Sequence, residues 1–369
     1  MRLNSLEITN LRNLQSVSLS PHPNINFIIG PNGSGKTSFL EAISLLSNGR
    51  SFRTPDAKKL IRQDTDKLVV FGLCQSEQLG NVRIGMSKDT SGTTLAKLDG
   101  QLQHKVSALA KVFPVLSIET NSLELIEGGP SLRRGILDWG MFHVEHSFLE
   151  TWNHYRNALK QKNALLKSGK KVSPADVHHW NTVIARYGDR LDTERARYTT
   201  SFEACFSKIS TQYFSQALTG VGFKYRSGWD KGKYPTLLEC LNDRLEMEVA
   251  RCSCLYGPHR AELDILWEGT LAKDICSRGQ KKLVLYGIRL AQIALMIERL
   301  GVSPILLLDD LPAELDDKNI KNVIRFLKAF PCQTFITAIN DQSITQEMLS
   351  AFEEHKMFHV EHGTFKETP

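Results

Sequence analysis

The residues from Gly30 to Thr37 read G-P-N-G-S-G-K-T, the spacing of small, cationic and hydroxyl residues found in phosphate-binding loops. Glycines at positions 30, 33 and 35 allow the backbone to form a nest of N–H groups that point at phosphate oxygens. We expect Lys36 to reach the β- and γ-phosphates of ATP and Thr37 to offer its hydroxyl to Mg²⁺. The predicted nucleotide-binding residues of this segment are Gly30, Pro31, Asn32, Gly33, Ser34, Gly35, Lys36, Thr37 and Ser38.

Two adjacent carboxylates follow a second apolar run, the aliphatic residues 305–308. A phosphate-binding loop needs an acidic partner for magnesium at the end of another buried strand. We expect Asp309 to hold Mg²⁺, through water, and Asp310 to orient or deprotonate the water that attacks the γ-phosphate. A solvated acidic turn would look the same in isolation, but its combination with the glycine-rich loop favours ATP hydrolysis.

A third segment, Ser277-Arg-Gly279-Gln, precedes an apolar helical stretch and places serine and glycine at a helix N-terminus, where anions bind. Its order in the chain resembles the signature of ABC ATPases. That resemblance implies an ATP-dependent head-to-tail homodimer, in which the signature serine contacts the γ-phosphate bound by the other subunit. Asn340 occupies the place of the switch residue, where many of these enzymes have histidine, and Asp310 the place of a glutamate. Both departures predict slow hydrolysis.

The elements that must position these residues are visible as short apolar patterns. Strands are expected at Leu3–Ile8, Val17–Ser20, Ile25–Ile29, Leu68–Cys74, Asn81–Ser87 and Thr93–Leu98, the last three joined by hairpin turns. A helix should follow Thr37, with Phe39, Ala42, Ile43 and Leu46 on one face, and end at Asn48–Gly49.

The middle of the chain has helical spacing instead. Apolar residues recur at helical intervals from Phe148 to Leu166 and from Pro174 to about Leu218, which predicts a helical hairpin or short coiled coil. Two ordinary helices packed on a core remain an alternative. We therefore predict an α/β fold, a mixed-sheet ATPase head with an inserted helical arm. The expected parts are residues 1–115, the part of the head with the phosphate loop, residues 116–220, the arm, and residues 221–369, the rest of the head. This last part carries the signature, the acidic strand and Ala313–Asp316, which resembles the loop that crosses to the partner subunit in ABC ATPases.

Composition sets broad limits on the partners and the compartment. The 46 Lys and Arg residues exceed the 40 Asp and Glu residues by six, which favours an anionic partner without proving one. No apolar run approaches the ~20 residues needed to cross a bilayer, and the N-terminus lacks a secretory apolar region. Seven cysteines without framework spacing favour a reducing compartment. A cytoplasmic protein without a membrane partner is expected.

Several further segments resemble the RecF family, SMC-like ABC ATPases of bacterial DNA repair, and the similarity runs from residue 1 to about Phe358. The segments are Asn10–Leu14, Gly49–Thr54, Gly128–Trp139 and Gly257–Leu263. The resemblance implies ATP-dependent dimerisation on single- and double-stranded DNA and at gap junctions. It also implies work with RecR and RecO in bringing RecA to gapped DNA. Arg12 and Arg53 lie in these segments and are predicted to contact a phosphate or adenine.

The DNA-contacting residues stay open at this level. Lysines crowd the predicted hairpin tip, where a DNA role competes with a solvated face, at Lys160, Lys162, Lys167, Lys170 and Lys171. Arg133 and Arg134 could brace a dimer or a phosphate, or form a buried ion pair. No glutamine lies in residues 117–123, where the glutamine-containing Q-loop of ABC ATPases would fall, so no residue is assigned to that role. A transporter motor and a scaffold that uses ATP without hydrolysing it are the rival functions.

Overall fold

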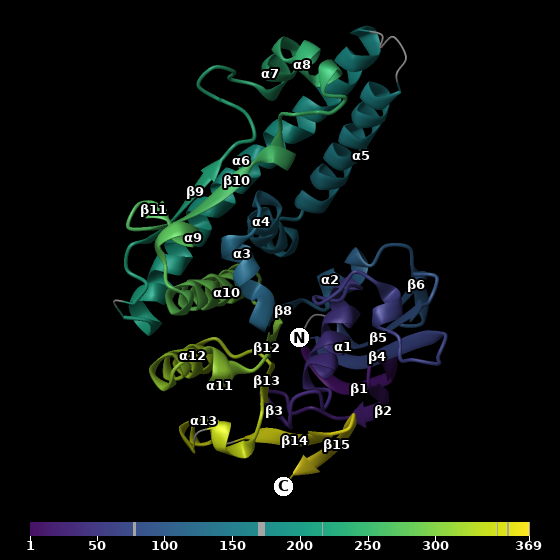
Figure 1. Ribbon diagram of the computed structural model, residues 1–369, viewed down its shortest axis with the longest axis vertical. Coiled ribbons are helices and arrows are strands. Elements are labelled where there is room, and N and C mark those ends of the chain that lie inside the picture. Colours follow the sequence, from purple (N-terminus) through teal and green to yellow (C-terminus); the bar gives the residue numbers. More distant parts are fainter. Residues whose placement is uncertain (77–78, 169–173, 216, 345, 353, 369) are drawn as a thin grey trace. The chain divides into compact units, whose positions relative to one another are not determined.

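The computed structural model describes residues 1–76, 79–168, 174–215, 217–344, 346–352 and 354–368. Packing divides the chain into two compact units (Figure 1). Unit 1 comprises Met1–Ser122, Gln212–Ser215 and Tyr286–Pro369, and unit 2 comprises Leu123–Thr211 and Gln216–Leu285. Within the described residues, no helix is long and apolar enough to cross a membrane.

The first sheet of unit 1 is antiparallel and six-stranded. Its strands, in spatial order, are β2 (Leu14–Leu19), β1 (Arg2–Leu11), β4 (Lys67–Ser76), β5 (Gly80–Asp89), β6 (Thr94–Leu98) and β7 (Gln101–Gln103). Burial alternates along β4 with a period of two, because successive side chains point to opposite faces of a strand. The strands and hairpins predicted in this region are confirmed.

The second sheet of unit 1 is mainly parallel. Its order is β15 (Thr364–Thr368), β14 (His355–Glu361), β3 (Ile25–Ile29), β13 (Thr334–Ala338), β12 (Ile305–Leu308) and β8 (Val115–Ile118), with only β15 antiparallel to its neighbour. Every residue of β3, β12 and β13 is buried, as expected for strands covered on both faces. The carboxyl ends of β3, β13, β12 and β8 therefore meet at one edge of the sheet.

Helix α1 (Lys36–Asn48) belongs to the same hydrophobic core as both sheets. Its core residues include Phe39, Ala42, Ile43 and Leu46, the face predicted from the sequence, and the helix ends at Gly49 in the left-handed conformation. The other helical segments wholly within unit 1 are η1 (Ala57–Lys59), α2 (Ser107–Val112), α11 (Leu311–Glu314), α12 (Asp317–Ala329), η4 (Asp341–Ser343) and α13 (Gln346–Ala351).

Unit 2 is built on an antiparallel pair of helices, α5 (Phe148–Lys167) and the 40-residue α6 (Pro174–Tyr213), whose last two residues group with unit 1. The rings of His154 and Tyr187 stack between them at 4.7 Å, and Gly188 lets Tyr155 approach closely. The unit also contains α3 (Glu124–Glu127), α4 (Pro130–Val144), α7 (Leu237–Asp243), α8 (Leu245–Ala250), η3 (Pro258–Arg260) and α9 (Ala272–Ile275). The two helices expected in this part of the chain are present.

A small antiparallel sheet lies along α6, in the order β11 (Thr270–Leu271), β10 (Glu262–Trp267) and β9 (Val221–Arg226). Phe223 of β9 packs edge-on against Phe202 and Phe206 of α6, with ring centroids 5.0 and 4.9 Å apart. The predicted boundaries at 116 and 220 differ from this division. The β8 residues 116–118 pair with β12 in unit 1, and residues 221–285 group with α6 because β9 and β10 pack on it. Helix α10 (Arg278–Leu300) begins in unit 2 and continues into unit 1, and η2 (Thr120–Leu123) ends at the boundary.

Candidate functional site

The predicted phosphate-binding loop leaves the carboxyl end of β3 and leads directly into α1. Gly35 has a φ of +122°, and a Cβ there would lie 2.7 Å from the side chain of Leu14. A Cβ on Gly30 would lie 2.2 Å from the carbonyl oxygen of Val360. Only glycine fits at these two positions. The strand, loop and helix context expected from the sequence is confirmed.

Lys36 folds back over the loop that precedes it. Its Nζ donates to the carbonyl oxygens of Gly30 at 2.6 Å and Pro31 at 3.1 Å. Burial lowers the pKa of Lys36 below its usual range, and the carboxylates of Asp310 and Asp309 partly offset that effect. The ammonium group thus lies at the centre of the loop, with two negative charges close enough to influence it.

Thr37 and Asp309 meet although 272 positions separate them in the chain. The Thr37 Oγ1 lies 3.1 Å from each carboxylate oxygen of Asp309. A hydroxyl and a carboxylate are the hard oxygen ligands that Mg²⁺ prefers, and here both stand beside a phosphate-type loop. The donor set therefore fits a magnesium ion.

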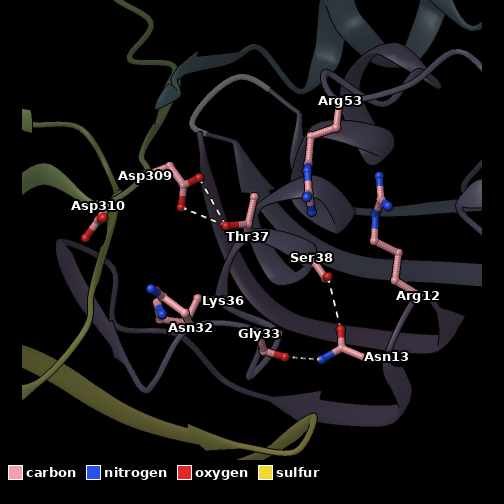
Figure 2. Close-up of a pocket in the computed structure, with 11 residues that line it drawn as sticks. Arg12, Asn13, Asn32, Gly33, Lys36, Thr37, Ser38, Arg53, Asp309 and Asp310 are labelled. Carbon is pink, nitrogen blue, oxygen red and sulfur yellow. Dashed lines mark hydrogen bonds between the residues drawn. The ribbon is translucent and has the colours of Figure 1, made fainter. Parts of the chain in front are cut away.

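A single pocket of about 390 Å³ gathers most of the predicted residues (Figure 2). Figure 2 shows Asp309 facing Thr37, with Arg12 and Arg53 together on another side of the pocket. The lining residues are Arg12, Asn13, Asn32, Gly33, Gly35, Lys36, Thr37, Ser38, Arg53, Asp309 and Asp310. A cradle of glycines and cations beside two carboxylates suits a polyphosphate that carries magnesium.

Thr337, on β13, is a residue of this site that the sequence analysis missed. Its Oγ1 donates to Asp309 at 2.8 Å and accepts the backbone N–H of Asp310 at 2.7 Å. Asp310 has a φ of +56°, which is uncommon for a residue with a side chain and occurs often at functional sites. Thr337 thus holds the carboxylate of Asp309 and the backbone of Asp310 at once. The sequence signal was weak, because Thr337 is one of two threonines in a short buried strand.

Two more residues that were not predicted support the pocket, Asn13 in its wall and Glu41 behind Arg12. Asn13 donates to the carbonyl oxygen of Gly33 and accepts from the Ser38 hydroxyl, both at 3.1 Å. The fully buried Glu41 accepts from Nε of Arg12 at 2.5 Å and from its terminal nitrogen at 3.0 Å. A carboxylate inside a buried helix was the available signal, because a buried acid requires a partner.

Glu119 follows β8 at the same sheet edge, next to the strand that carries Asp309. Burial raises the pKa of Glu119 to about 7, against the opposing effects of its hydrogen bond with Ser117 and of the Arg289 charge. The segment 117–123 has no glutamine for the Q-loop role. It does place the buried carboxyl group of Glu119 near Asp309, a predicted magnesium ligand.

The remaining predicted residues lie outside the residues that line this pocket. Asn340 is exposed, two positions beyond β13. Ser277 and Gly279 belong to unit 2. Ser277 precedes α10, where its N–H donates to Gln280 Oε1 at 2.8 Å and its Oγ accepts the Gln280 N–H at 3.3 Å. This reciprocal pair is a capping box, so the motif also starts the helix.

Two expectations about basic residues are now decided. Lys162 is fully buried against Glu248 at 2.5 Å, so the idea that it belongs to an exposed charged tip is wrong. Arg133 is buried and pairs with Glu262 at 2.8 Å, which bears out the ion-pair alternative. Arg134 donates to the carbonyl oxygen of Ala261. The predicted tip residues Lys170 and Lys171 lie outside the described residues.

Comparison with known proteins identifies the family. The family model for the RecF/RecN/SMC N-terminal domain matches residues 2–365. The chain is 38% identical to the DNA replication and repair protein RecF of Stutzerimonas stutzeri (strain A1501), over 98% of the chain and 96% of that protein.

Solved structures give the same result. A structure of the recombination mediator protein RecF-ATP in the RecFOR pathway aligns with a TM-score of 0.87 and 26% identity, covering 100% of this chain and 98% of that one. An SMC head bound to the C-terminal winged-helix domain of ScpA shares the fold, with a TM-score of 0.60 and 15% identity over 100% of this chain and 97% of that one. The chain therefore belongs to the RecF family, within the larger group that carries the RecF/RecN/SMC N-terminal domain.

Proposed function

We propose that this protein is a magnesium-dependent ATPase that binds DNA in an ATP-controlled manner during recombinational repair and replication restart. One observation carries the proposal. Thr37 and Asp309, from distant parts of the chain, meet at 3.1 Å in a pocket that also holds Lys36 and Asp310. Two facts about relatives support it, since the aligned RecF structure contains ATP and the curated relatives are DNA replication and repair proteins.

The charged and hydroxyl-bearing residues that the proposal uses have distinct roles in the reaction. The N–H groups of the loop and Lys36 bind the β- and γ-phosphates, and Lys36 must exchange its two carbonyl partners for phosphate oxygens. Thr37 and Asp309 hold Mg²⁺, which supplies charge neutralisation of the phosphates when it is bound. Asp310 orients a water molecule and accepts its proton as the water attacks the γ-phosphorus and the bond to ADP breaks. Arg12 and Arg53 contact a phosphate or the adenine.

The proposed active form is a head-to-tail homodimer assembled with ATP. In it, Ser277 and Gly279 at the start of α10 contact the γ-phosphate bound to the other copy, and Asn340 takes the switch position. Hydrolysis is slow, because Asp310 is shorter than the usual glutamate and Asn340 cannot donate a proton as a histidinium can. We also expect DNA to stimulate hydrolysis. ATP turnover would then time release from DNA, and a rate near 100 per second at saturating DNA would contradict this timing role.

The biological setting follows from the family membership. We propose binding to single- and double-stranded DNA and to gap junctions, and cooperation with RecR and RecO in loading RecA. The protein is placed in the cytoplasm, in keeping with seven cysteines that form no disulfide.

The decisive experiment measures DNA binding of the wild type and of Lys36→Met, each with and without ATP. ATP should strengthen DNA binding of the wild type and leave the variant unchanged. Equal affinity in all four conditions would remove the ATP switch. Hydrolysis that is absent even in a single-turnover assay would favour the scaffold that uses ATP only to hold its parts together.

A further inference from the structure

One exposed face of α5 in unit 2 carries basic and amide side chains but no acidic one. Arg156, Lys160, Asn163 and Lys167 follow one another at steps of four, three and four residues, the spacing that places side chains on one face of a helix. Together with Asn153, Asn157, Leu159 and Ala164 they line a shallow hollow of about 700 Å³. We call these eight residues the α5 face.

The cations of the α5 face have no carboxylate partner among the residues that the structure describes. The Arg156 guanidinium lies over the ring of Trp152, 5.9 Å from its centroid. Glu150, the only acidic residue of α5, lies near His154, at 3.8 Å. Basic residues elsewhere in unit 2 are often neutralised, as in the pairs Arg133–Glu262, Lys162–Glu248, Arg195–Asp138, Arg226–Asp264 and Lys281–Glu127. The α5 face is therefore an uncompensated positive surface.

We infer that the α5 face binds the phosphate backbone of DNA. The inference rests on the proposed DNA-binding function and adds the surface that performs it. From Arg156 to Lys167 the helix rises about 16 Å, a length over which duplex DNA carries about ten negative charges. Arginine, lysine and asparagine are also the side chains that commonly contact phosphate and sugar oxygens. Contacts to phosphate and sugar carry no base information, so the binding is independent of sequence.

A triple variant, Arg156→Gln, Lys160→Gln and Lys167→Gln, tests this assignment in the full-length protein with ATP. Its matched control is Lys208→Gln, Lys224→Gln and Arg251→Gln, which removes the same three charges from exposed positions elsewhere in unit 2. A charge-conserving variant, Arg156→Lys, Lys160→Arg and Lys167→Arg, serves as the rescue. Affinity for fluorescent duplex and single-stranded oligonucleotides is measured by anisotropy between about 50 and about 200 mM salt, the range over which phosphate contacts change affinity most visibly.

The slope of log affinity against log salt for duplex should fall in magnitude by about 2.7 in the triple variant, about 0.9 for each lost phosphate contact. For single strands the expected fall is about 2.1. The rescue variant should keep the wild-type slope. The control should change the slope for duplex by less than about 0.9, the value of one phosphate contact. ATP hydrolysis without DNA should be unchanged in all variants.

Each contrary outcome has a distinct meaning. If the wild type binds DNA and the triple variant keeps its slope, the α5 face is not the contact surface, while the proposed function stands. Equal losses in the triple variant and the control would point to net charge alone and also overturn the inference. If the triple variant binds DNA normally but loses binding to an acidic protein partner, the face is a protein-docking surface. Failure of the wild type to bind DNA with ATP would refute both proposals.

Discussion

Replacing Thr337 with valine would test whether this buried hydroxyl positions the Asp309 carboxylate and the backbone of Asp310 for ATP hydrolysis. Valine keeps the branched shape but removes the acceptor of the Asp310 N–H at 2.7 Å and one of the two hydroxyls that donate to Asp309 Oδ1, leaving the Thr37 hydroxyl at 3.1 Å. A stranded buried donor costs about 1–3 kcal/mol, and a hydrogen bond to a charged group contributes about 1.5–3 kcal/mol. If about 1.4–2.8 kcal/mol of this loss is felt in the transition state, ATP hydrolysis should slow about 10- to 100-fold.

The assay is single-turnover hydrolysis, combined with nucleotide titration and urea unfolding, for the wild type, Thr337→Val and Thr337→Ser. Serine keeps the hydroxyl, so its rate should stay near that of the wild type. A purely structural role for Thr337 would lower the unfolding free energy without changing the rate of the folded protein. Wild-type hydrolysis by the valine variant, or equally slow hydrolysis by the serine variant, would refute the assigned role.

Three more predictions concern buried charges. Lys162→Met should lower the free energy of unfolding by about 3–5 kcal/mol, because it leaves the buried Glu248 carboxylate without its cation. Adding Glu248→Leu should restore most of that loss, and urea unfolding that shows additive losses would argue against the pair. Burial lowers the pKa of His143 and His259 to about 4, so the unfolded chain, with values near 6.5, binds more protons between these limits. The two histidines should therefore lower stability as the pH drops from about 6.5 toward 4, by about 2 kcal/mol each at pH 5. The raised pKa of Glu119 acts in the opposite sense, so the measurement is made on Glu119→Gln, and an unfolding free energy of this variant that is equal at pH 7.5 and pH 5 would disprove the prediction. Glu41→Gln should loosen the arginine it holds and weaken ATP binding about tenfold, which titration with a fluorescent ATP analogue would measure.

The nucleotide pocket was predictable where its chemistry is local. The glycines, Lys36 and Thr37 lie within eight consecutive residues, and the loop functions only between a buried strand and a helix. Asp309 was found because an apolar run ending in carboxylates is the signal of a buried strand that delivers an acid to a sheet edge. Both signals are short stretches of chain, so no knowledge of the strand order was required.

Thr337, Asn13 and Glu41 were missed because their roles depend on register between distant segments. Thr337 reaches Asp309 only because β13 lies beside β12 in a parallel pairing of Leu308 with Ile336. That strand order cannot be read from the chain itself. The boundaries of unit 2 were misjudged for the same reason, since the packing of β9 on α6 is a tertiary contact.

Lys162 was misjudged although a local signal existed. The buried residues of α5 include Tyr155, Ala158, Lys162 and Leu166, which recur at steps of three, four and four. This is the spacing of a helix face that packs on a core. Counting lysines near the predicted tip ignored this periodicity, while Lys160 and Lys167 lie on the opposite, exposed face. Periodicity should therefore take precedence over local charge density when charged residues of a helix are assigned.

The repeated string M-F-H-V-E-H shows how strongly surroundings decide local structure. Residues 141–144 form the end of α4, where the Glu145 N–H donates to the Met141 carbonyl oxygen at 2.9 Å. Residues 357–361 form β14, where burial alternates and Phe358 pairs with Ile28 of β3. The first copy continues the apolar face of a helix, whereas the second pairs with the parallel strand β3. These tertiary interactions outweigh the weak intrinsic conformational preference of six residues. The two copies lie in different units, and among the described residues no group of three or more metal-ligating side chains forms. Identical sequence here therefore carries no common local structure.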